Sequence, residues 1–299
     1  MVDAQIIKAA ATEAGFDACG IAAALPITEE EFGLNRWLAN GCQAGMRYME
    51  GHTDMRHDAG LLVPGAKSVI AVLLGYKPSR RIARIAQYAY GEDYHERMKR
   101  MLYEMIALIR KQYPKFEAKP CVDTVPISDK LWARRAGLGW IGKNTLLVNP
   151  ALGSYCFIGE LVTTEAADRY DTPMAEGCGD CERCLRGCPN KAIGNGVDAR
   201  RCASYHTIEN RDERLPEGIR LSGYAFGCDC CQMACPYNEQ AAVRYELAAE
   251  RELELESLAT ADAATFKRLT KHSAINRIKQ SQWLRNMAAN DEQQKAAGN

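Results

Sequence analysis

The sequence predicts an α/β protein in three parts: a three-layer α/β domain over residues 1–172, a cysteine-rich module over 173–238 and a short helical region over 239–299. Apolar, β-branched runs alternate with amphipathic helical stretches in the first part, which is the pattern of helices packed on a sheet. Nine of the thirteen cysteines fall in the second part, and Ala, Glu and Leu dominate the start of the third.

The composition is that of a globular chain. Its 299 residues are 47% hydrophobic and 25% charged, which is too apolar for a disordered protein. The 38 basic residues equal the 38 acidic ones, so the chain as a whole is not suited to coating nucleic acid non-specifically. No stretch approaches about 18 uninterrupted apolar residues, and no secretory signal is visible. We therefore expect a cytoplasmic protein with no membrane partner.

The elements of the first part follow from local patterns. A buried strand is expected over 68–74, because the β-branched run SVIAVLL follows Pro64 and Gly65. The strongest helix is expected over 92–111, where apolar residues recur every three or four positions. Shorter helices are expected over 3–15 and 29–40, ending at glycines. Further strands are expected over 19–24, 115–123 and 155–163.

The third part changes character along its length. A helix is expected over 240–258 and a frayed tail over 292–299. Between 263 and 290 there are six basic residues and no acidic one. This stretch is either a solvated helix face or a patch that contacts phosphates. The six residues are Lys267, Arg268, Lys271, Arg277, Lys279 and Arg285.

Cysteine spacing in the second part indicates iron–sulfur clusters. Cys178, Cys181, Cys184 and Cys188 are separated by two, two and three residues, and Pro189 follows, as in bacterial ferredoxins. Structural zinc is the alternative, but zinc sites pair two C-x-x-C knuckles rather than repeating a run of this kind. Clustered cysteines in a reducing compartment are also more often metal ligands than disulfides.

A second, degenerate run completes a ferredoxin-like module. Cys228, Cys231 and Cys235 precede Pro236, and we expect Cys202 to supply the missing ligand. Cys230 allows another register, although two-residue spacing favours Cys228. In two-cluster ferredoxins the cysteine before proline binds the other cluster. The predicted ligands are Cys178, Cys181, Cys184 and Cys235 for one [4Fe–4S] cluster, and Cys188, Cys202, Cys228 and Cys231 for the other.

Two further features have weaker interpretations. The remaining cysteines, at 19, 42, 121 and 156, lie among apolar residues and are expected to be small core residues. The glycine-rich stretch 137–145 matches neither a Walker A loop nor a dinucleotide-binding fingerprint. It indicates only a close approach of the backbone to a ligand.

Several longer segments occur in a fixed order over about residues 15–240. They are RHDAGLLVPGAKSVI at 56–70, YAYGEDYH at 88–95, VDTVP at 122–126, GLGWIGKN at 137–144 and the two cysteine runs. Together they resemble the epoxyqueuosine reductase family. WLRN at 283–286 is similar to the family's C-terminal segment. We expect a short form, without the helical-repeat extension of many members.

The resemblance implies an oxidoreductase that binds cobalamin and two [4Fe–4S] clusters. Members reduce epoxyqueuosine to queuosine at the wobble position of tRNA, using electrons that an external low-potential donor feeds through the clusters to Co(I). The resemblance places the proton donor at Asp123. It places cofactor contacts at Arg56, Tyr94, Asp123, Ser128, Ser204 and Asp229. It also favours tRNA as the partner of the basic stretch, and we expect a monomer.

Two alternatives concern individual residues. Asp123 could simply cap a helix beginning near Ser128, whereas a proton donor would need a pKa raised by a dry site. His95 lies in Asp-x-His-x-x-Met rather than the Asp-x-His-x-x-Gly of proteins that ligate cobalt through histidine. We therefore expect cobalamin to be bound base-off, without a protein ligand to cobalt.

Three alternative functions use the same cofactors or some of them. A reductive dehalogenase-like enzyme has the same cofactor set but usually carries an export signal. A ferredoxin-type electron carrier would hold clusters and no cobalamin. A cobalamin reductase acting on another protein would show no dependence on tRNA.

Overall fold

The computed structural model describes residues 1–29, 33–82 and 84–297. A four-stranded sheet in the order β1-β2-β6-β3 forms the centre of the first part. Every neighbouring pair is antiparallel, and β2 pairs with β6 from Ser68 opposite Thr163 to Gly75 opposite Cys156. The strands are β1 (Ala18–Ala23), β2 (Ser68–Gly75), β3 (Lys119–Cys121) and β6 (Cys156–Thr163).

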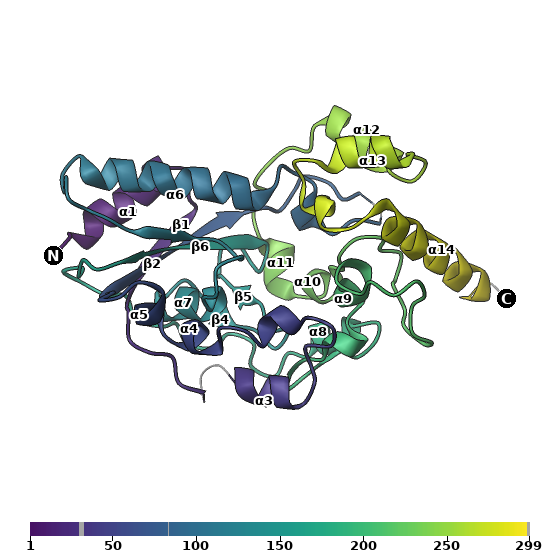
Figure 1. The fold of residues 1–299 in the computed structure, drawn as a ribbon, viewed down its shortest axis with the longest axis horizontal. Coiled ribbons are helices and arrows are strands. Elements are labelled where there is room, and N and C mark those ends of the chain that lie inside the picture. Colours follow the sequence, from purple (N-terminus) through teal and green to yellow (C-terminus); the bar gives the residue numbers. More distant parts are fainter. Residues whose placement is uncertain (30–32, 83, 298–299) are drawn as a thin grey trace.

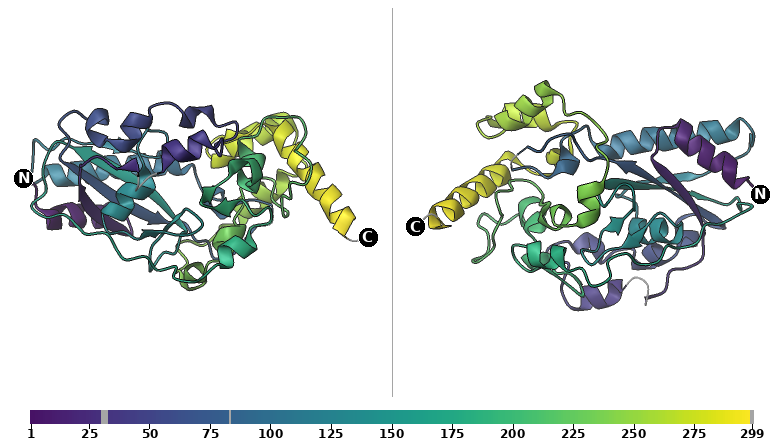
Figure 2. Two further views of the ribbon diagram at one scale, coloured as in Figure 1. Left: turned by 90° about the horizontal axis from the view of Figure 1, so that it is seen from below. Right: turned by 180° about the vertical axis from the view of Figure 1, so that it is seen from behind.

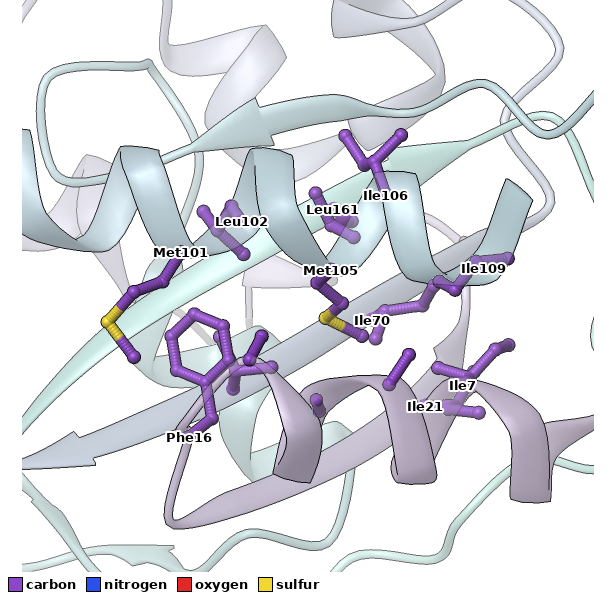
Figure 3. Packing of buried hydrophobic residues seen from close by; sticks show 14 of the residues in the cluster. Ile7, Phe16, Ile21, Ile70, Met101, Leu102, Met105, Ile106, Ile109 and Leu161 are labelled. Atoms are coloured by element: carbon purple, nitrogen blue, oxygen red, sulfur yellow. The ribbon is translucent and has the colours of Figure 1, made fainter. Parts of the chain in front are cut away.

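Helices cover both faces of this sheet, which gives the three layers that the sequence predicts (Figure 1). On one face lie α1 (Ala4–Glu13) and α6 (Tyr94–Arg110). Figure 3 shows Ile7 of α1 and Met105 of α6 packed with Ile70 and Leu161 of the sheet. The other face packs on α7 (Asp129–Arg135), with α4 (Thr53–His57) and α5 (Ala59–Leu62) nearby. Burial of both sheet faces explains why β2 is an unbroken apolar run from Val69 to Leu74.

Most predicted elements of this part agree with the structure to within two residues at each end. The strand predicted over 115–123 is an exception, because β3 covers only Lys119–Cys121. The chain leaves the sheet at Asp123, whose φ of 49° lies in the left-handed region. The helix predicted over 29–40 is described only in part, as α3 (Leu34–Ala39), because residues 30–32 lie outside the described residues.

The cysteine-rich part consists of short elements joined by loops. Its helices are α8 (Arg183–Gly187), α9 (Ala203–Ile208), α10 (Cys230–Met233) and α11 (Pro236–Gln240), with a small hairpin of β7 (Ile193–Gly194) and β8 (Gly196–Val197). A hairpin of the first part, β4 (Trp140–Ile141) and β5 (Leu147–Val148), is also separate from the main sheet. The 3-10 turns are η1 (Arg47–Met49), η2 (Gln87–Ala89), η3 (Ala199–Arg201) and η4 (Ala274–Arg277).

The C-terminal helices are α12 (Ala249–Ser257), α13 (Ala263–Thr270) and α14 (Gln280–Ala297). The helix predicted over 240–258 is wrong for residues 241–248. That segment instead runs beside residues 77–79, where Arg244 N donates to Lys77 O at 2.8 Å and Ser79 N donates to Tyr245 O at 3.1 Å. These tertiary hydrogen bonds replace the helical ones.

The frayed tail predicted over 292–299 is also wrong as far as residue 297. Helix α14 continues to Ala297, and the side chain of Gln293 holds it to the cysteine-rich part. Its amide accepts a hydrogen bond from Leu221 N at 3.0 Å and donates one to Ile219 O at 2.8 Å. The Gln293 side chain thus pairs with backbone groups of Ile219 and Leu221. These bonds hold the last turns of α14 in place, which explains why the helix does not end earlier.

A third hydrophobic core joins the parts of the chain. Ile85 and Tyr90 of the first part pack there with Phe226 of the cysteine-rich part and Trp283 of α14. The two further views in Figure 2 show α14 lying beside the cysteine-rich part, at the end of the molecule away from the N-terminus. The boundaries of the three parts remain predictions. Within the described ranges, no helix is long and apolar enough to cross a membrane.

Candidate functional site

Asp123 lies where the chain turns out of the sheet after β3. Its left-handed backbone conformation, at φ 49°, is one that aspartate tolerates better than most residues do. The turn directs the carboxylate toward the N-terminus of α6, and 60% of the side chain stays exposed. Asp123 is thus a carboxylate that solvent or a ligand can reach, at the edge of a rigid sheet.

A chain of hydrogen bonds connects Asp123 to the first turn of α6. Oδ2 of Asp123 accepts from the Tyr94 hydroxyl at 2.9 Å and lies 3.0 Å from Nε2 of His95. Nδ1 of His95 lies 2.7 Å from Oδ1 of Asp93, which also caps α6 by accepting from the His95 backbone N–H. The imidazole is therefore held between two carboxylates.

This arrangement controls where a proton resides. The hydrogen bonds from His95 and Tyr94 hold the pKa of Asp123 below its ordinary value. Partial burial opposes the charged imidazole, but the hydrogen bonds to Asp123 and Asp93 outweigh it and raise the pKa of His95. These shifts favour the proton on His95 rather than on Asp123. The raised pKa of Asp123 is expected only in a dry site beside the cofactor, so it stays a prediction.

The structure contradicts the helix-cap interpretation of Asp123. Ser128, not Asp123, is the N-cap of α7, and its side chain makes no capping hydrogen bond. The carboxylate of Asp123 instead bonds to α6, so the helix-cap interpretation is wrong. Both ring nitrogens of His95 are engaged with carboxylates. That His95 is no ligand of cobalt stays a prediction.

Aromatic rings and a guanidinium surround the Asp123 carboxylate. The ring of Tyr94 stacks on Phe157 at 4.5 Å and meets Tyr88 edge-on at 6.3 Å. Arg277 contributes from η4: its guanidinium lies over the ring of Tyr48, and its charge helps to lower the pKa of Asp123. The surroundings of Asp123 are therefore built by the first and third parts of the chain together.

The other predicted cofactor contacts lie in different settings. Ser128 donates to Arg56 O at 2.8 Å, which joins α7 to α4. Nε of Arg56 is buried and lacks a partner among the described residues, so it has an unused donor. Asp229 is 1% exposed, and its Oδ2 accepts from the backbone and side-chain N–H groups of Gln87. Ser204 lies in α9, two residues after Cys202.

One group of four thiols lines a cavity of about 390 Å³. Cys178, Cys181, Cys184 and Cys235 border it, so the cysteine before Pro236 reaches the first run, as crossed ligation requires. Tetrahedral zinc would draw four sulfurs to about 2.3 Å from a single atom and leave no such space. The residues present thus fit a multi-atom cluster.

The second predicted ligand set also lies together. Burial raises the pKa of Cys231 to about 12, and the adjacent thiols of Cys202 and Cys188 raise it in the same direction. Cys228 shares a hydrogen bond with Cys230. The position of Cys188 beside Cys202 and Cys231, rather than in the first cavity, again agrees with crossing. The choice of Cys228 rather than Cys230 as the cluster ligand stays a prediction.

The remaining cysteines differ from one another. Cys121 is fully buried in the core beneath α7, and Cys19 and Cys156 pack at the edges of the sheet cores. These three agree with the expectation of small core residues. Cys42 does not, because it is half-buried outside all three cores, where its carbonyl accepts from Ala199 N.

The six basic residues predicted to contact nucleic acid fall into two groups. Lys267, Arg268, Lys271 and Lys279 are exposed. Arg277 is paired with Glu209 at 3.0 Å. Arg285 donates to the carbonyls of His206, Asn210 and Asp212 at 2.6–3.1 Å, and burial lowers its pKa. The geometry of Arg285 is that of a structural clamp.

Several residues of the site escaped sequence reasoning. Tyr48 and Glu209 lie far from any motif, and only the fold brings them to Arg277. Within the glycine-rich stretch, Asn144 borders the first cysteine cavity and Trp140 donates to Cys178. The density of glycines and the family resemblance of GLGWIGKN pointed to this stretch, but not to a role for these two side chains.

Comparison with known proteins first defines the class. A family model described as a 4Fe-4S double cluster binding domain matches residues 177–238, so the second part is an iron–sulfur domain built for two clusters. A model described as epoxyqueuosine reductase QueG, DUF1730 matches residues 56–124, which include Arg56, Tyr94 and Asp123.

Whole-chain relatives then define the family. An epoxyqueuosine reductase of Synechococcus sp. (strain RCC307) is 40% identical, over 95% of this chain and 92% of its own. One from Gloeobacter violaceus is 41% identical, over 94% and 93%. This chain belongs to the epoxyqueuosine reductase family, which sets it apart from a reductive dehalogenase or a simple electron carrier.

Solved structures agree with this assignment. The epoxyqueuosine reductase of Streptococcus thermophilus superimposes with a TM-score of 0.85 at 27% identity, over 97% of this chain and 82% of that one. Another epoxyqueuosine reductase was crystallised with an epoxyqueuosine-modified tRNA-Tyr stem loop. It superimposes with a TM-score of 0.80 at 26% identity, over 96% of this chain and 80% of that one.

Proposed function

We propose that this protein reduces epoxyqueuosine in tRNA to queuosine. The reaction adds two electrons and two protons to the epoxide and releases its oxygen as water. The hydrogen-bonded group of Asp123, His95 and Tyr94 carries this proposal, because it places a proton and an accessible carboxylate at one point. Family membership and the relative bound to an epoxyqueuosine-modified stem loop support the choice of substrate.

Cobalamin is the proposed cofactor, bound base-off beside Asp123. The unused donor of Arg56 and the rings of Tyr94 and Tyr88 offer polar and aromatic contacts that suit a large macrocycle with polar edges. Ser128, Ser204 and Asp229 are the further proposed contacts. When bound in its Co(I) state, the cofactor would supply a strong nucleophile for the epoxide carbon.

The chain's own contribution is the proton. Hydrogen bonding lowers the pKa of Asp123 and raises the pKa of His95, whose Nε2 lies 3.0 Å away, so the pair favours an ionised carboxylate beside a protonated imidazole. A substrate that excludes water from the exposed face of Asp123 raises the pKa of this carboxyl, so the proton moves from His95 to Asp123. Asp123 then protonates the epoxide oxygen as it departs, and Asp93 keeps the imidazole oriented for the next proton.

Electrons are proposed to reach this site through two [4Fe–4S] clusters with crossed ligands. Cys178, Cys181, Cys184 and Cys235 would hold the cluster that accepts electrons from an external low-potential donor, because their thiols border the surface cavity. Cys202 and Cys231 would hold the second cluster close to the cofactor, because they lie beside the predicted contacts Ser204 and Asp229 in sequence. The exposed cations Lys267, Arg268, Lys271 and Lys279, with Arg277 nearer Asp123, are the proposed contacts for tRNA phosphates.

The proposed function predicts an activity that can be measured directly. Full-length protein is reconstituted anaerobically with iron, sulfide and cobalamin, and its ultraviolet–visible spectrum should show corrin bands beside iron–sulfur absorption. The pre-reduced enzyme is then mixed with tRNA that contains epoxyqueuosine, and the nucleosides are analysed by mass spectrometry. Formation of queuosine in a single turnover is the expected result. A loaded enzyme that leaves the epoxide intact would contradict the proposal.

A further inference from the structure

The glycine-rich stretch 137–145 has a structural role that its sequence does not reveal. It forms the β4–β5 hairpin, whose tip is closed by bonds from Gly142 N to Leu146 O and from Thr145 N to Gly142 O, each 2.8 Å long. Lys130 of α7 fixes the tip by donating to Thr145 O at 2.7 Å. Residues of this tip border the cavity lined by the first group of cysteines.

Trp140 makes a direct contact with one of those cysteines. Its indole Nε1 donates to Sγ of Cys178 at 3.4 Å. The ring is held edge-on against Tyr237 at 4.9 Å, and the Tyr237 hydroxyl donates to Gly177 O. A Cβ added at Gly177 would lie 2.5 Å from the Trp140 ring, so only glycine lets the indole pack against the residue that precedes Cys178.

Asn144 offers a second donor to the same cavity. It is 3% exposed, and its Nδ2 has no hydrogen-bond partner among the described residues. Its Oδ1 accepts from Leu146 N at 3.2 Å, which fixes the amide so that the NH₂ group is the free end. A buried donor without a partner costs about 1–3 kcal/mol. Since Asn144 lines the cavity, sulfur atoms of a bound cluster can supply the missing partner.

The hairpin tip is shaped for this approach. A Cβ added at Gly142 would lie 2.9 Å from Oδ1 of Asn144 and 3.6 Å from Sγ of Cys178. Glycine at this position therefore lets the backbone pass between the amide and the thiol. Among the glycines of the stretch, Gly142 is the one that lies next to a thiol of the first cysteine group, whereas Gly137 and Gly139 allow close contacts with the backbone of Thr172 and Val148.

We propose that Trp140 and Asn144 donate hydrogen bonds to the sulfur atoms of the cluster at Cys178, Cys181, Cys184 and Cys235, and so raise its reduction potential. Donors at sulfur stabilise the reduced cluster more than the oxidised one, because reduction makes the cluster more negative. The inference rests on the proposed ligand set of that cluster, and it is independent of cobalamin and tRNA.

The test is a redox titration of the reconstituted full-length protein, followed by EPR. Trp140→Phe removes the indole donor and keeps an aromatic ring against Tyr237. Asn144→Leu removes the amide at similar volume. In each variant we expect the ratio of reduced to oxidised first cluster at a given potential to fall by about tenfold, which is a midpoint lower by about 59 mV for one electron. The second cluster should keep its midpoint.

A matched control tests whether the loss of any buried indole donor has this effect. Nε1 of Trp283 is a buried indole donor with no hydrogen-bond partner among the described residues, and Trp283 lies in the third core against Phe266. Trp283→Phe should leave both midpoints unchanged. Unchanged midpoints of the first cluster in both the Trp140 and Asn144 variants would overturn the proposal.

A measurement on the wild-type protein keeps the proposal testable even if a variant fails to assemble its cluster. After exchange into D₂O, the reduced first cluster should show deuterium couplings from donors at its sulfurs by electron–nuclear double resonance. Absence of these couplings would also overturn the proposal. A wild-type protein that loads no cluster at Cys178 would instead contradict the proposed ligand set, so the two failures are distinct.

Discussion

Replacing Asp123 with Asn separates proton donation from every static role of this side chain. The amide keeps the size of the carboxylate, and its oxygen can still accept from the Tyr94 hydroxyl or from His95. It cannot carry a proton to a leaving oxygen. If Asp123 is the proton donor, the variant should bind cofactors and tRNA normally and fail in the chemical step.

The expected effect of Asp123→Asn differs in size between a structural role and a role as proton donor. The Asp123 side chain is 60% exposed and that of His95 is 31% exposed, so solvent screens their ion pair. Pairs of this kind contribute about 0.2–1 kcal/mol to stability. Loss of a general acid slows a reaction by about 10²–10⁴-fold, which corresponds to about 2.7–5.5 kcal/mol in the barrier. A purely structural role cannot produce the larger effect.

The same pair predicts a pH dependence of stability. Asp123 has a lowered pKa, so its contribution is present above its unfolded value of 3.8 and is lost as pH falls through the folded pKa. His95 has a raised pKa, so its contribution is present below 6.5 and is lost as pH rises through the folded pKa. Asp123→Asn should therefore have its largest effect on stability between these values, near pH 5. There it should lower the free energy of unfolding by no more than about 1 kcal/mol. Urea denaturation at several pH values would measure this.

The assay is a single turnover of epoxyqueuosine-containing tRNA by pre-reduced enzyme, which isolates the chemical step from electron delivery. Asp123→Ala serves as the control for lost contacts, and both variants should be slowed by a similar factor. Near wild-type turnover of the Asn variant would refute the role of Asp123. The acid would then have to be His95 or Tyr94, the two groups hydrogen-bonded to it.

Other predictions concern the clusters and the basic stretch. Cys188→Ala should damage the cluster held by Cys228 and Cys231, and EPR of that variant showing loss of the other cluster would refute crossed ligation. Cys230→Ser should keep about eight irons per chain by iron analysis, since each cubane holds four; loss of half would show that the ligand register is wrong. Neutralising three exposed lysines should flatten the salt dependence of tRNA binding by about two to three units of slope without changing cofactor spectra, whereas an unchanged slope would mean a solvated helix face. Those lysines are Lys267, Lys271 and Lys279.

Features that depend on spacing along the chain could be predicted from the sequence. The two cysteine runs, one from Cys178 and one ending before Pro236, predicted an iron–sulfur domain for two clusters, because thiols two or three residues apart can reach one cluster only in a few geometries. The period of the apolar residues in 94–110 and the β-branched run at 68–75 defined a helix and a strand in the same way. Each of these signals lies within a few residues of the element it specifies.

Features that depend on partners distant in sequence were decided only by the tertiary structure. Asp123 and His95 are 28 residues apart, and it is their contact that lowers the pKa of Asp123 and raises the pKa of His95. Arg285 looks like any basic residue until carbonyls 73–79 residues away saturate its guanidinium. Residues 241–248 have helical composition, yet hydrogen bonds to residues 77–79 hold them extended. A local pattern states what a segment can form alone, whereas burial and hydrogen-bond pairing across the fold determine which of those possibilities is stabilised.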